Sequence, residues 1–143
     1  MKQKQRRLLW LFIVPVIMII TVIIYSVNEY TRAVSDTSRM QANFHVTAQD
    51  LVDDFLREER SATGKYAGNV VSVYGMVDKI QLNRSGYSVY LKASSAMSSV
   101  LCQFPEEAST EIKALKPGML TTVKGICTGY LMDIILERCV VDN

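Results

Sequence analysis

The stretch NVVSVYGMVDKIQL, residues 69–82, decides the fold, because its side chains alternate between apolar and other types over its whole length. Such a period of two predicts a β-strand with one buried face. The glycine near its centre is typical of a bulge or a sharp coil, so we expect a long strand that bends to serve both halves of a barrel. The predicted inner side comprises Val71, Val73, Gly75 and Val77, and the outer side comprises Ser72, Tyr74, Met76 and Asp78.

Four more strands are predicted after this one. The turn NRSG leads into YSVYLKAS, with Val89 and Leu91 inward, and a third strand, SVLCQF, ends before Pro105. The segment PEEASTEIKALKPG is helical in pattern and stops at its last two residues, Pro117 and Gly118. The strands MLTTVKGIC and DIILERCVV then form a closing hairpin around TGYLM.

A helix is predicted ahead of the first strand, from residue 47 to about residue 61. Thr47 is a suitable N-cap, and Asp50 places a negative charge in the first turn, where the helix dipole favours it. The predicted buried face holds Ala48, Leu51, Val52, Phe55 and Leu56. The outer face holds Asp53, Asp54, Glu58 and Glu59, and we therefore interpret these carboxylates as a solvated surface and not as a catalytic pair.

This order of elements predicts a mostly β protein. Five strands with a helix between the third and fourth is the arrangement of the OB-fold, a partly open Greek-key barrel. We expect residues 47–143 to form one five-stranded OB-fold-like barrel with an N-terminal helix, preceded in the chain by one transmembrane helix.

Residues 8–27 carry no charged side chain, and a helix of about 20 residues covers the ~30 Å hydrocarbon layer of a membrane. The alternative, a cleaved signal peptide, has a shorter apolar core and a small-residue cleavage site. We expect residues 1–7 to be a cytoplasmic tail, because their basic residues obey the positive-inside rule, and residues 28–46 to be a polar stalk. The sequence thus predicts a single-pass protein of the cytoplasmic membrane whose C-terminal domain lies outside the cytoplasm.

The formal charge of +2 is divided unevenly along the chain. Residues 1–44 hold six basic and two acidic side chains, for +4, which leaves −2 on residues 45–143. A nucleic-acid-binding domain normally carries a basic patch that neutralises phosphates. The charge of the predicted barrel therefore disfavours a nucleic-acid partner.

Several segments together resemble a family of small anchored bacterial envelope proteins whose OB domain is similar to tRNA-anticodon-binding domains. They are TAQDLVDDF, KYAGNVVSVYGMVDKI, VLCQF, LKPGMLTTVKGICTGY and DIILERC, which span about residues 47–140. The resemblance implies the OB-fold, and it does not choose among nucleic-acid, oligosaccharide and protein ligands.

Neither a cofactor nor an enzymatic activity is expected from the motifs. The architecture is similar to that of the periplasmic haem chaperone, which attaches haem through a histidine near its C-terminal end, whereas the single histidine here, His45, precedes the barrel. His45 has no second histidine or cysteine at ligand spacing, so we expect no metal site. The sequence has no G-x-S-x-G, P-loop or H-E-x-x-H motif, and its cysteines lack an obvious base.

The three cysteines all fall in the inward phase of predicted strands, provided that a bulge at Glu137–Arg138 turns Cys139 inward. OB topology places the third and fifth strands side by side and parallel, which brings Cys102 and Cys139 to one end of the barrel and Cys127 to the other. A disulfide between Cys102 and Cys139 and three buried thiols are both open interpretations.

OB-fold ligands usually lie across the second and third strands of the barrel, flanked by two loops. Tyrosines beside arginine or lysine can stack on bases or sugars. We expect a non-catalytic binding or assembly module, held by its membrane helix, whose partner is an envelope protein or an oligosaccharide; nucleic acid is the alternative. The candidate ligand-binding residues are Tyr74, Arg84, Tyr90, Lys92 and Tyr130.

Overall fold

The protein is described by a computed structural model that covers residues 15–26, 37–94 and 98–142. The chain divides into two compact units, Met1–Ala33 and Val34–Asn143. Residues 15–26 of the first unit form a helix. The predicted span over residues 8–27 lies partly outside the described residues, as do the tail and the first part of the stalk. Among the described residues, no helix combines the length and the apolar character needed to cross a membrane.

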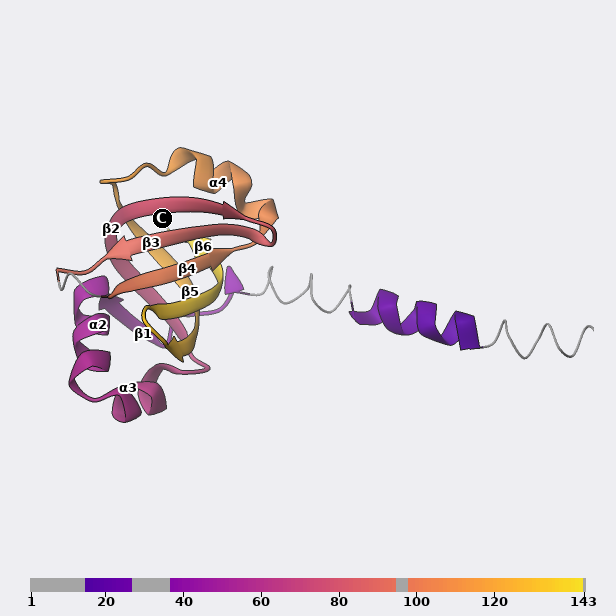
Figure 1. The fold of residues 1–143 in the computed structure, drawn as a ribbon, viewed down its shortest axis with the longest axis horizontal. Helices are drawn as coiled ribbons and strands as arrows, with labels where there is room; N and C mark the ends of the chain where they lie inside the picture. Colours follow the sequence, from indigo (N-terminus) through magenta and orange to yellow (C-terminus); the bar gives the residue numbers. More distant parts are fainter. Residues whose placement is uncertain (1–14, 27–36, 95–97, 143) are drawn as a thin grey trace, which may run out of the picture. The chain divides into compact units, whose positions relative to one another are not determined.

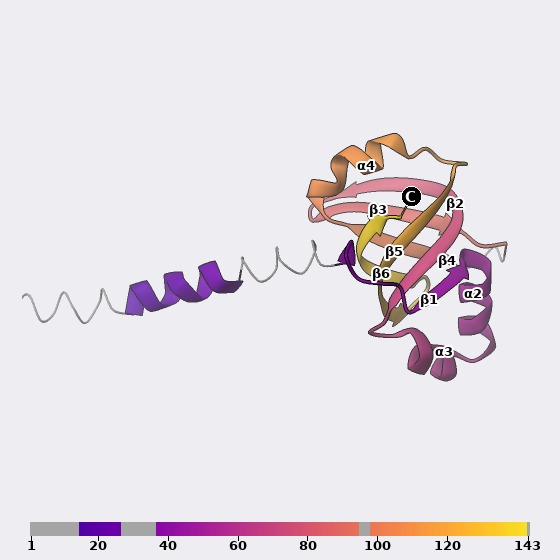
Figure 2. The same ribbon diagram turned by 180° about the vertical axis from the view of Figure 1, so that it is seen from behind.

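The second unit is a β-barrel with short helices at its ends (Figures 1 and 2). Five of its strands, β2 to β6, follow the predicted order, and the 3₁₀ helix η1 and helix α4 separate the third of them from the fourth. The predicted mostly β, OB-fold-like barrel is therefore confirmed. Its elements are β1 (Phe44–Thr47), α2 (Ala48–Arg57), α3 (Glu59–Tyr66), β2 (Val70–Asn83), β3 (Gly86–Lys92), β4 (Ser99–Phe104), η1 (Glu106–Ala108), α4 (Ser109–Ala114), β5 (Leu120–Tyr130) and β6 (Ile134–Val141).

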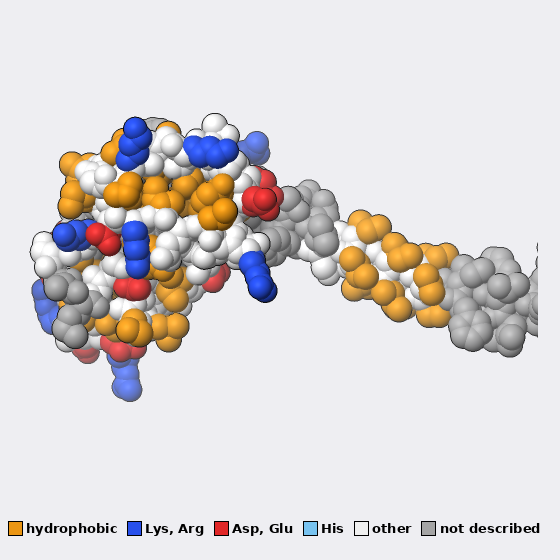
Figure 3. All heavy atoms as spheres, turned by 45° about the horizontal axis from the view of Figure 1, so that its top comes forward, with side chains coloured by type: hydrophobic (Ala, Val, Ile, Leu, Met, Phe, Trp, Pro, Cys, Tyr) orange, Lys and Arg blue, Asp and Glu red, His pale blue; other side chains and the backbone are white. Residues whose placement is uncertain are grey.

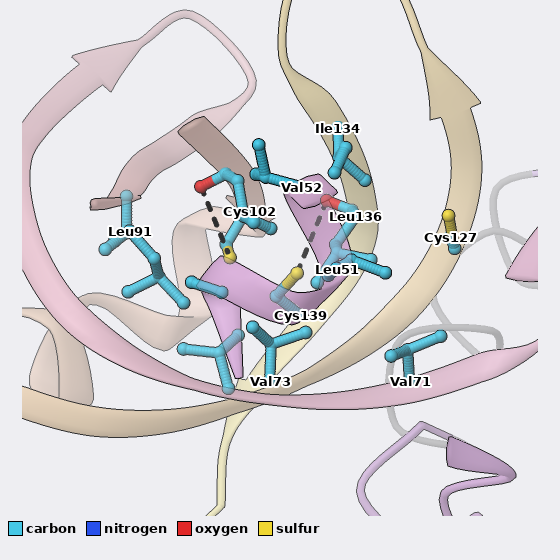
Figure 4. Close-up of a cluster of buried hydrophobic side chains, with 14 of the residues drawn as sticks. Leu51, Val52, Val71, Val73, Leu91, Cys102, Cys127, Ile134, Leu136 and Cys139 are labelled. Atoms are coloured by element: carbon cyan, nitrogen blue, oxygen red, sulfur yellow. Dashed lines mark hydrogen bonds between the residues drawn. The ribbon is translucent and has the colours of Figure 1, made fainter. Parts of the chain in front are cut away.

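The barrel closes because β2 is long enough to pair with both β5 and β3. Its first half lies antiparallel to β5 and its second half antiparallel to β3, while β4 and β6 pair in parallel as the topology predicts. Figure 4 shows the interior, where the inward side chains of β2, including Val71 and Val73, are fully buried. The predicted inner and outer faces of β2 are correct as far as Val77.

Gly75 has a different role from the predicted bulge. A Cβ atom at this position would lie 2.9 Å from the Ala48 Cβ atom and 3.3 Å from the Leu91 Cβ atom. The glycine therefore lets α2 pack directly on β2 and β3. The bulge lies three residues later, where the register between β2 and β3 shifts around Asp78. Beyond it the phase reverses, so that Lys79 faces outward and Ile80 packs against the core.

The end of the predicted stalk, residues 44–46, belongs to a strand that the sequence analysis missed. β1 pairs in parallel with β2, with Phe44 opposite Val71 and Thr47 opposite Tyr74. Phe44 and Val46 pack against the barrel core. A four-residue strand next to a helix cap shows too little alternation to be recognised in isolation.

The predicted helix over residues 47–61 is two helices. Thr47 caps α2 as expected, because its hydroxyl accepts a hydrogen bond from the Asp50 backbone N–H over 3.0 Å. The helix ends at Glu58, whose φ and ψ of −155° and 89° leave the helical region, and α3 continues to Tyr66. Leu56, predicted to be buried, is 51% exposed, because only a narrow stripe of α2 contacts the barrel.

Candidate ligand-binding site

The outward side chains of three neighbouring strands form the first candidate site, which we call the barrel face and define as Lys79, Tyr90, Lys92 and Leu101. In the register of the sheet, Tyr90 of β3 lies between Lys79 of β2 and Leu101 of β4. Lys92 lies at the end of β3, one outward position beyond Tyr90. The structure thus brings two of the predicted residues, Tyr90 and Lys92, to one side of the sheet.

Lys79 is a member of this face that the sequence analysis missed. Its ammonium nitrogen lies 4.1 Å from the centroid of the Tyr90 ring, a cation–π contact. Without the bulge at Asp78, the alternation of β2 would point Lys79 into the barrel. The charge of Lys79 at a position predicted to be buried was therefore a signal that the inward and outward positions of β2 are exchanged before this residue.

Arg84 lies in the turn between β2 and β3 and is exposed. This turn and Lys92 lie at opposite ends of β3, so the structure does not bring Arg84 and Lys92 together. Figure 3 shows a band of hydrophobic side chains over one side of the barrel, with lysine and arginine side chains at its borders. The surface of the barrel therefore offers both apolar contact area and positive charge.

Tyr130 does not join this group. It lies in β5, which continues beyond the predicted strand end, and its ring centroid is 5.9 Å from that of Phe55 in α2. Its hydroxyl oxygen is 3.2 Å from the Ser98 hydroxyl. The strand extends because Gly129, with a φ of +139°, absorbs an irregularity in the pairing with β6. Tyr130 thus packs between the helix and the barrel instead of flanking a ligand in a loop.

Tyr74 lies at a second place, on the outer side of the first half of β2. It is 47% exposed and lines an open cavity of about 360 Å³ between β1, the start of α2 and β5. We call this the Tyr74 cavity. Of the five predicted residues, Tyr74 is the one that lines this cavity, whose walls are His45, Val46, Thr47, Asp50, Ser72, Tyr74 and Thr122.

The acidic residues of α2 have structural partners. The Asp54 carboxylate accepts hydrogen bonds from the Tyr66 hydroxyl over 2.7 Å and from the Lys65 ammonium over 3.2 Å. The hydrogen bond from Tyr66 holds the pKa of Asp54 below its usual value, and burial raises the pKa of the Tyr66 hydroxyl. Asp53 accepts from the Gln49 side-chain amide. The contacts of Asp54 tie α3 back onto α2, whereas that of Asp53 lies within α2.

The three cysteines are buried free thiols, and Cys102 and Cys139 lie side by side in the core (Figure 4). Burial raises the pKa of Cys139 and of Cys127, so both remain protonated at neutral pH. Cys139 points inward because of a bulge at Arg138, which has a φ of 53°. The disulfide between Cys102 and Cys139 stays a prediction.

His45 is exposed on β1 and lines the Tyr74 cavity. Within residues 15–26, 37–94 and 98–142, no group of three or more histidine, cysteine, aspartate or glutamate side chains is placed to hold a metal ion. The two candidate places offer aromatic rings, hydroxyls and charged groups.

A comparison with family models gives one match, tRNA_anti-like, over residues 1–141. The chain belongs to the tRNA_anti-like family. This agrees with the resemblance found in the sequence and with the observed barrel. A comparison with curated proteins gives no match.

Solved structures similar to this tRNA_anti-like chain include a lipoprotein of Klebsiella pneumoniae subsp. pneumoniae whose name suggests nucleic-acid binding. It is 18% identical, with a TM-score of 0.59, and the match covers 76% of this chain and 97% of that one. The Stn1 and Ten1 structure from yeast matches at 12% identity and a TM-score of 0.45, covering 72% and 64% of the two chains. The S. pombe Stn1-Ten1 complex matches at 14% identity and a TM-score of 0.43, and the match covers 52% of this chain and 58% of that one. At 18% identity, the likeness to the Klebsiella lipoprotein shows a shared fold.

Proposed function

We propose that this protein is a non-catalytic binding module, anchored in the cytoplasmic membrane by its N-terminal segment, that holds an envelope protein or oligosaccharide on its barrel face. The observation that carries the proposal is the openness of that face. In the described part of the chain, α2 and α3 gather at one end of the barrel and α4 at the other, and the sheet of β3 and β4 between them stays uncovered (Figure 1).

The composition of the barrel face suits a ligand with both apolar and polar parts. Tyr90 and Leu101 are half-buried and offer apolar area, while Lys79 and Lys92 are exposed and add charge around them. Binding sites typically combine an apolar centre with a polar border in this manner. The location outside the cytoplasm is supported by the uncharged residues 8–27 and by the basic residues that precede them.

Nucleic acid is the second candidate ligand. It is favoured by the name of the Klebsiella lipoprotein with a similar fold and by the basic residues Lys79, Arg84 and Lys92 along one hairpin. It is opposed by the charge of −2 on residues 45–143, because nucleic-acid affinity comes largely from phosphate neutralisation.

A comparative pull-down tests the proposal. The intact protein is captured from solubilised membranes in three forms: the wild type, the double variant Lys79→Glu/Lys92→Glu, and the control Lys113→Glu on α4. We expect a partner that the wild type and the control recover and the double variant loses. Recovery by all three forms, or by none, would contradict the assignment to the barrel face.

The same three forms distinguish the second candidate. Binding to a single-stranded oligonucleotide that weakens steeply with salt, and that the double variant loses, would favour nucleic acid over an envelope ligand.

A further inference from the structure

The Tyr74 cavity lies outside the barrel face, on the part of β2 that pairs with β1 and β5. Its volume of about 360 Å³ is near the lower end of the ~300–1,000 Å³ range of small-molecule sites. Residues from β1, α2, β2 and β5 form its walls, so its shape depends on the folded domain and not on one flexible loop.

The floor of the cavity offers an aromatic ring. Tyr74 projects outward from β2 and is 47% exposed, whereas Tyr66 is 1% exposed and Tyr90 carries the Lys79 ammonium over its ring. Among these described tyrosines, Tyr74 is the one that combines an exposed ring with a concave setting. An exposed ring in a concave site favours a ligand with an apolar face of similar size.

Hydroxyl groups surround this ring. Thr47 and Thr122 are the cross-strand neighbours of Tyr74, and Ser72 lies two residues before it on the same face. Ser72 is 3% exposed, and both its hydroxyl-bearing side chain and that of Thr122 belong to the lining of the cavity. Hydroxyls in the lining of a site can donate hydrogen bonds to a ligand and accept them from it, which suits a ligand rich in hydroxyls.

The charges at the cavity disfavour an anion. Asp50 places a carboxylate in the wall, and one of its oxygens accepts a 2.7 Å hydrogen bond from the Thr47 hydroxyl. The other oxygen has no donor among the described residues, so it can accept from a ligand hydroxyl. Thr47 also accepts from the Asp50 backbone N–H, so the start of α2 is already capped and offers less to a phosphate.

We infer that the Tyr74 cavity binds a ring of a neutral saccharide, with the apolar face of the sugar on Tyr74 and its hydroxyls on Asp50, Ser72 and Thr122. This inference goes beyond the proposed function, because it concerns a second site on the same barrel. A sugar ring combines C–H faces, which pack on aromatic rings, with hydroxyls that both donate and accept. The cavity matches both properties.

The test is a titration of the full-length, ¹⁵N-labelled protein in dodecylphosphocholine micelles, whose headgroup contains no sugar. The probes are cellotetraose and a β-1,4-linked N-acetylglucosamine tetramer, with an eight-residue thymidine oligonucleotide as an anionic comparison. The proteins are the wild type, Tyr74→Ala, Tyr74→Phe and the exposed control Leu56→Ala. The readouts are the amide chemical shifts and the Kd.

We expect at least one saccharide to shift amides at residues 45–50, 72–74 and 122. Tyr74→Ala should raise the Kd about tenfold, whereas Tyr74→Phe and Leu56→Ala should change it by less than about threefold. No saccharide-dependent shift at these residues, equal binding by Tyr74→Ala, or the same shifts with the oligonucleotide would overturn the inference.

The outcome separates the two proposals. If the saccharides leave the cavity unshifted while the membrane pull-down still depends on Lys79 and Lys92, the cavity inference fails and the proposed function stands. If the saccharides bind at Tyr74 and the pull-down recovers no partner, the cavity inference stands and the role of the barrel face fails.

Discussion

Replacing Gly75 with alanine should weaken the packing of α2 on the barrel. The new Cβ atom would lie 2.9 Å from the Ala48 Cβ atom and 3.3 Å from the Leu91 Cβ atom, whereas carbon atoms normally pack at ~3.5–4.0 Å. Both neighbours are Cβ atoms, which cannot rotate away from the contact, so the backbone of α2 must move. Overpacking of this kind typically costs about 1–3 kcal/mol, and we expect Gly75→Ala to fall in that range.

The measurement is the free energy of unfolding of the Val34–Asn143 unit in urea, followed by circular dichroism. Ala48→Gly removes the nearest atom from the contact and should restore much of the loss when combined with Gly75→Ala. On its own it should cost up to about 1 kcal/mol, because glycine is a poor helix residue. The control is Gly64→Ala in α3, where a Cβ atom meets nothing within 4 Å, and which should gain about 0.5–1 kcal/mol.

Two results would refute this reasoning. One is a Gly75→Ala variant as stable as the wild type, which would mean that α2 does not rest on β2. The other is strict additivity of Gly75→Ala and Ala48→Gly, because atoms in contact should show a coupling energy of about 0.5–3 kcal/mol.

Three further predictions concern single contacts. Tyr66→Phe should lower the free energy of unfolding by about 1–2 kcal/mol at pH 7, because the hydrogen bond to Asp54 is lost. The pKa of Asp54 is lowered on folding, so this contribution should be present above about pH 4 and vanish as acid protonates Asp54. A loss of stability that does not depend on pH would contradict this prediction. Arg138→Gly should raise the free energy of unfolding in urea by up to about 1–2 kcal/mol, because a left-handed φ of 53° disfavours residues with a Cβ atom. A loss of stability would contradict this account of the bulge. Peptide mass spectrometry of unreduced, alkylated protein from outside the cytoplasm distinguishes the two interpretations of the cysteines. If Cys102 is bonded to Cys139, we expect a peptide linked through these two residues and a loss of roughly 2–4 kcal/mol of stability on reduction. If the thiols stay free, as the structure has them, all three are alkylated after unfolding and packing alone holds this end of the barrel.

The sequence was sufficient for the barrel because its strands alternate clearly and its turns carry glycine and proline. A bulge at Glu137–Arg138 was also considered as the condition for an inward Cys139, and the structure has this bulge. The sequence did not predict the strand β1, because Phe44 and His45 are positioned by pairing with β2 and not by a local pattern. The break at Glu58 also went unpredicted; it lies between Asp54 and Tyr66, whose side chains are joined by a hydrogen bond that no local pattern shows.

The candidate site was predictable in part. Tyr90 and Lys92 could be placed on one face by counting along a strand, and Tyr74 on the outer side of β2 by the same count. Lys79 could not, because a bulge at Asp78 reversed the phase before it. Tyr130 was misplaced because the strand β5 runs through Gly129 to Tyr130, into the segment predicted as a loop. Errors of both kinds arise where backbone irregularities, and not side-chain patterns, decide which way a residue points.

The most direct test of the proposed binding module is a photocrosslinking amino acid placed at Lys92 in intact cells, compared with the same group at Glu58, which is exposed at the end of α2. The account predicts an ultraviolet-dependent adduct at position 92, with an envelope protein or glycan recovered from the membrane fraction, and no such adduct at position 58. Equal adducts at both positions, no adduct at position 92, or an adduct of nucleic acid would contradict it.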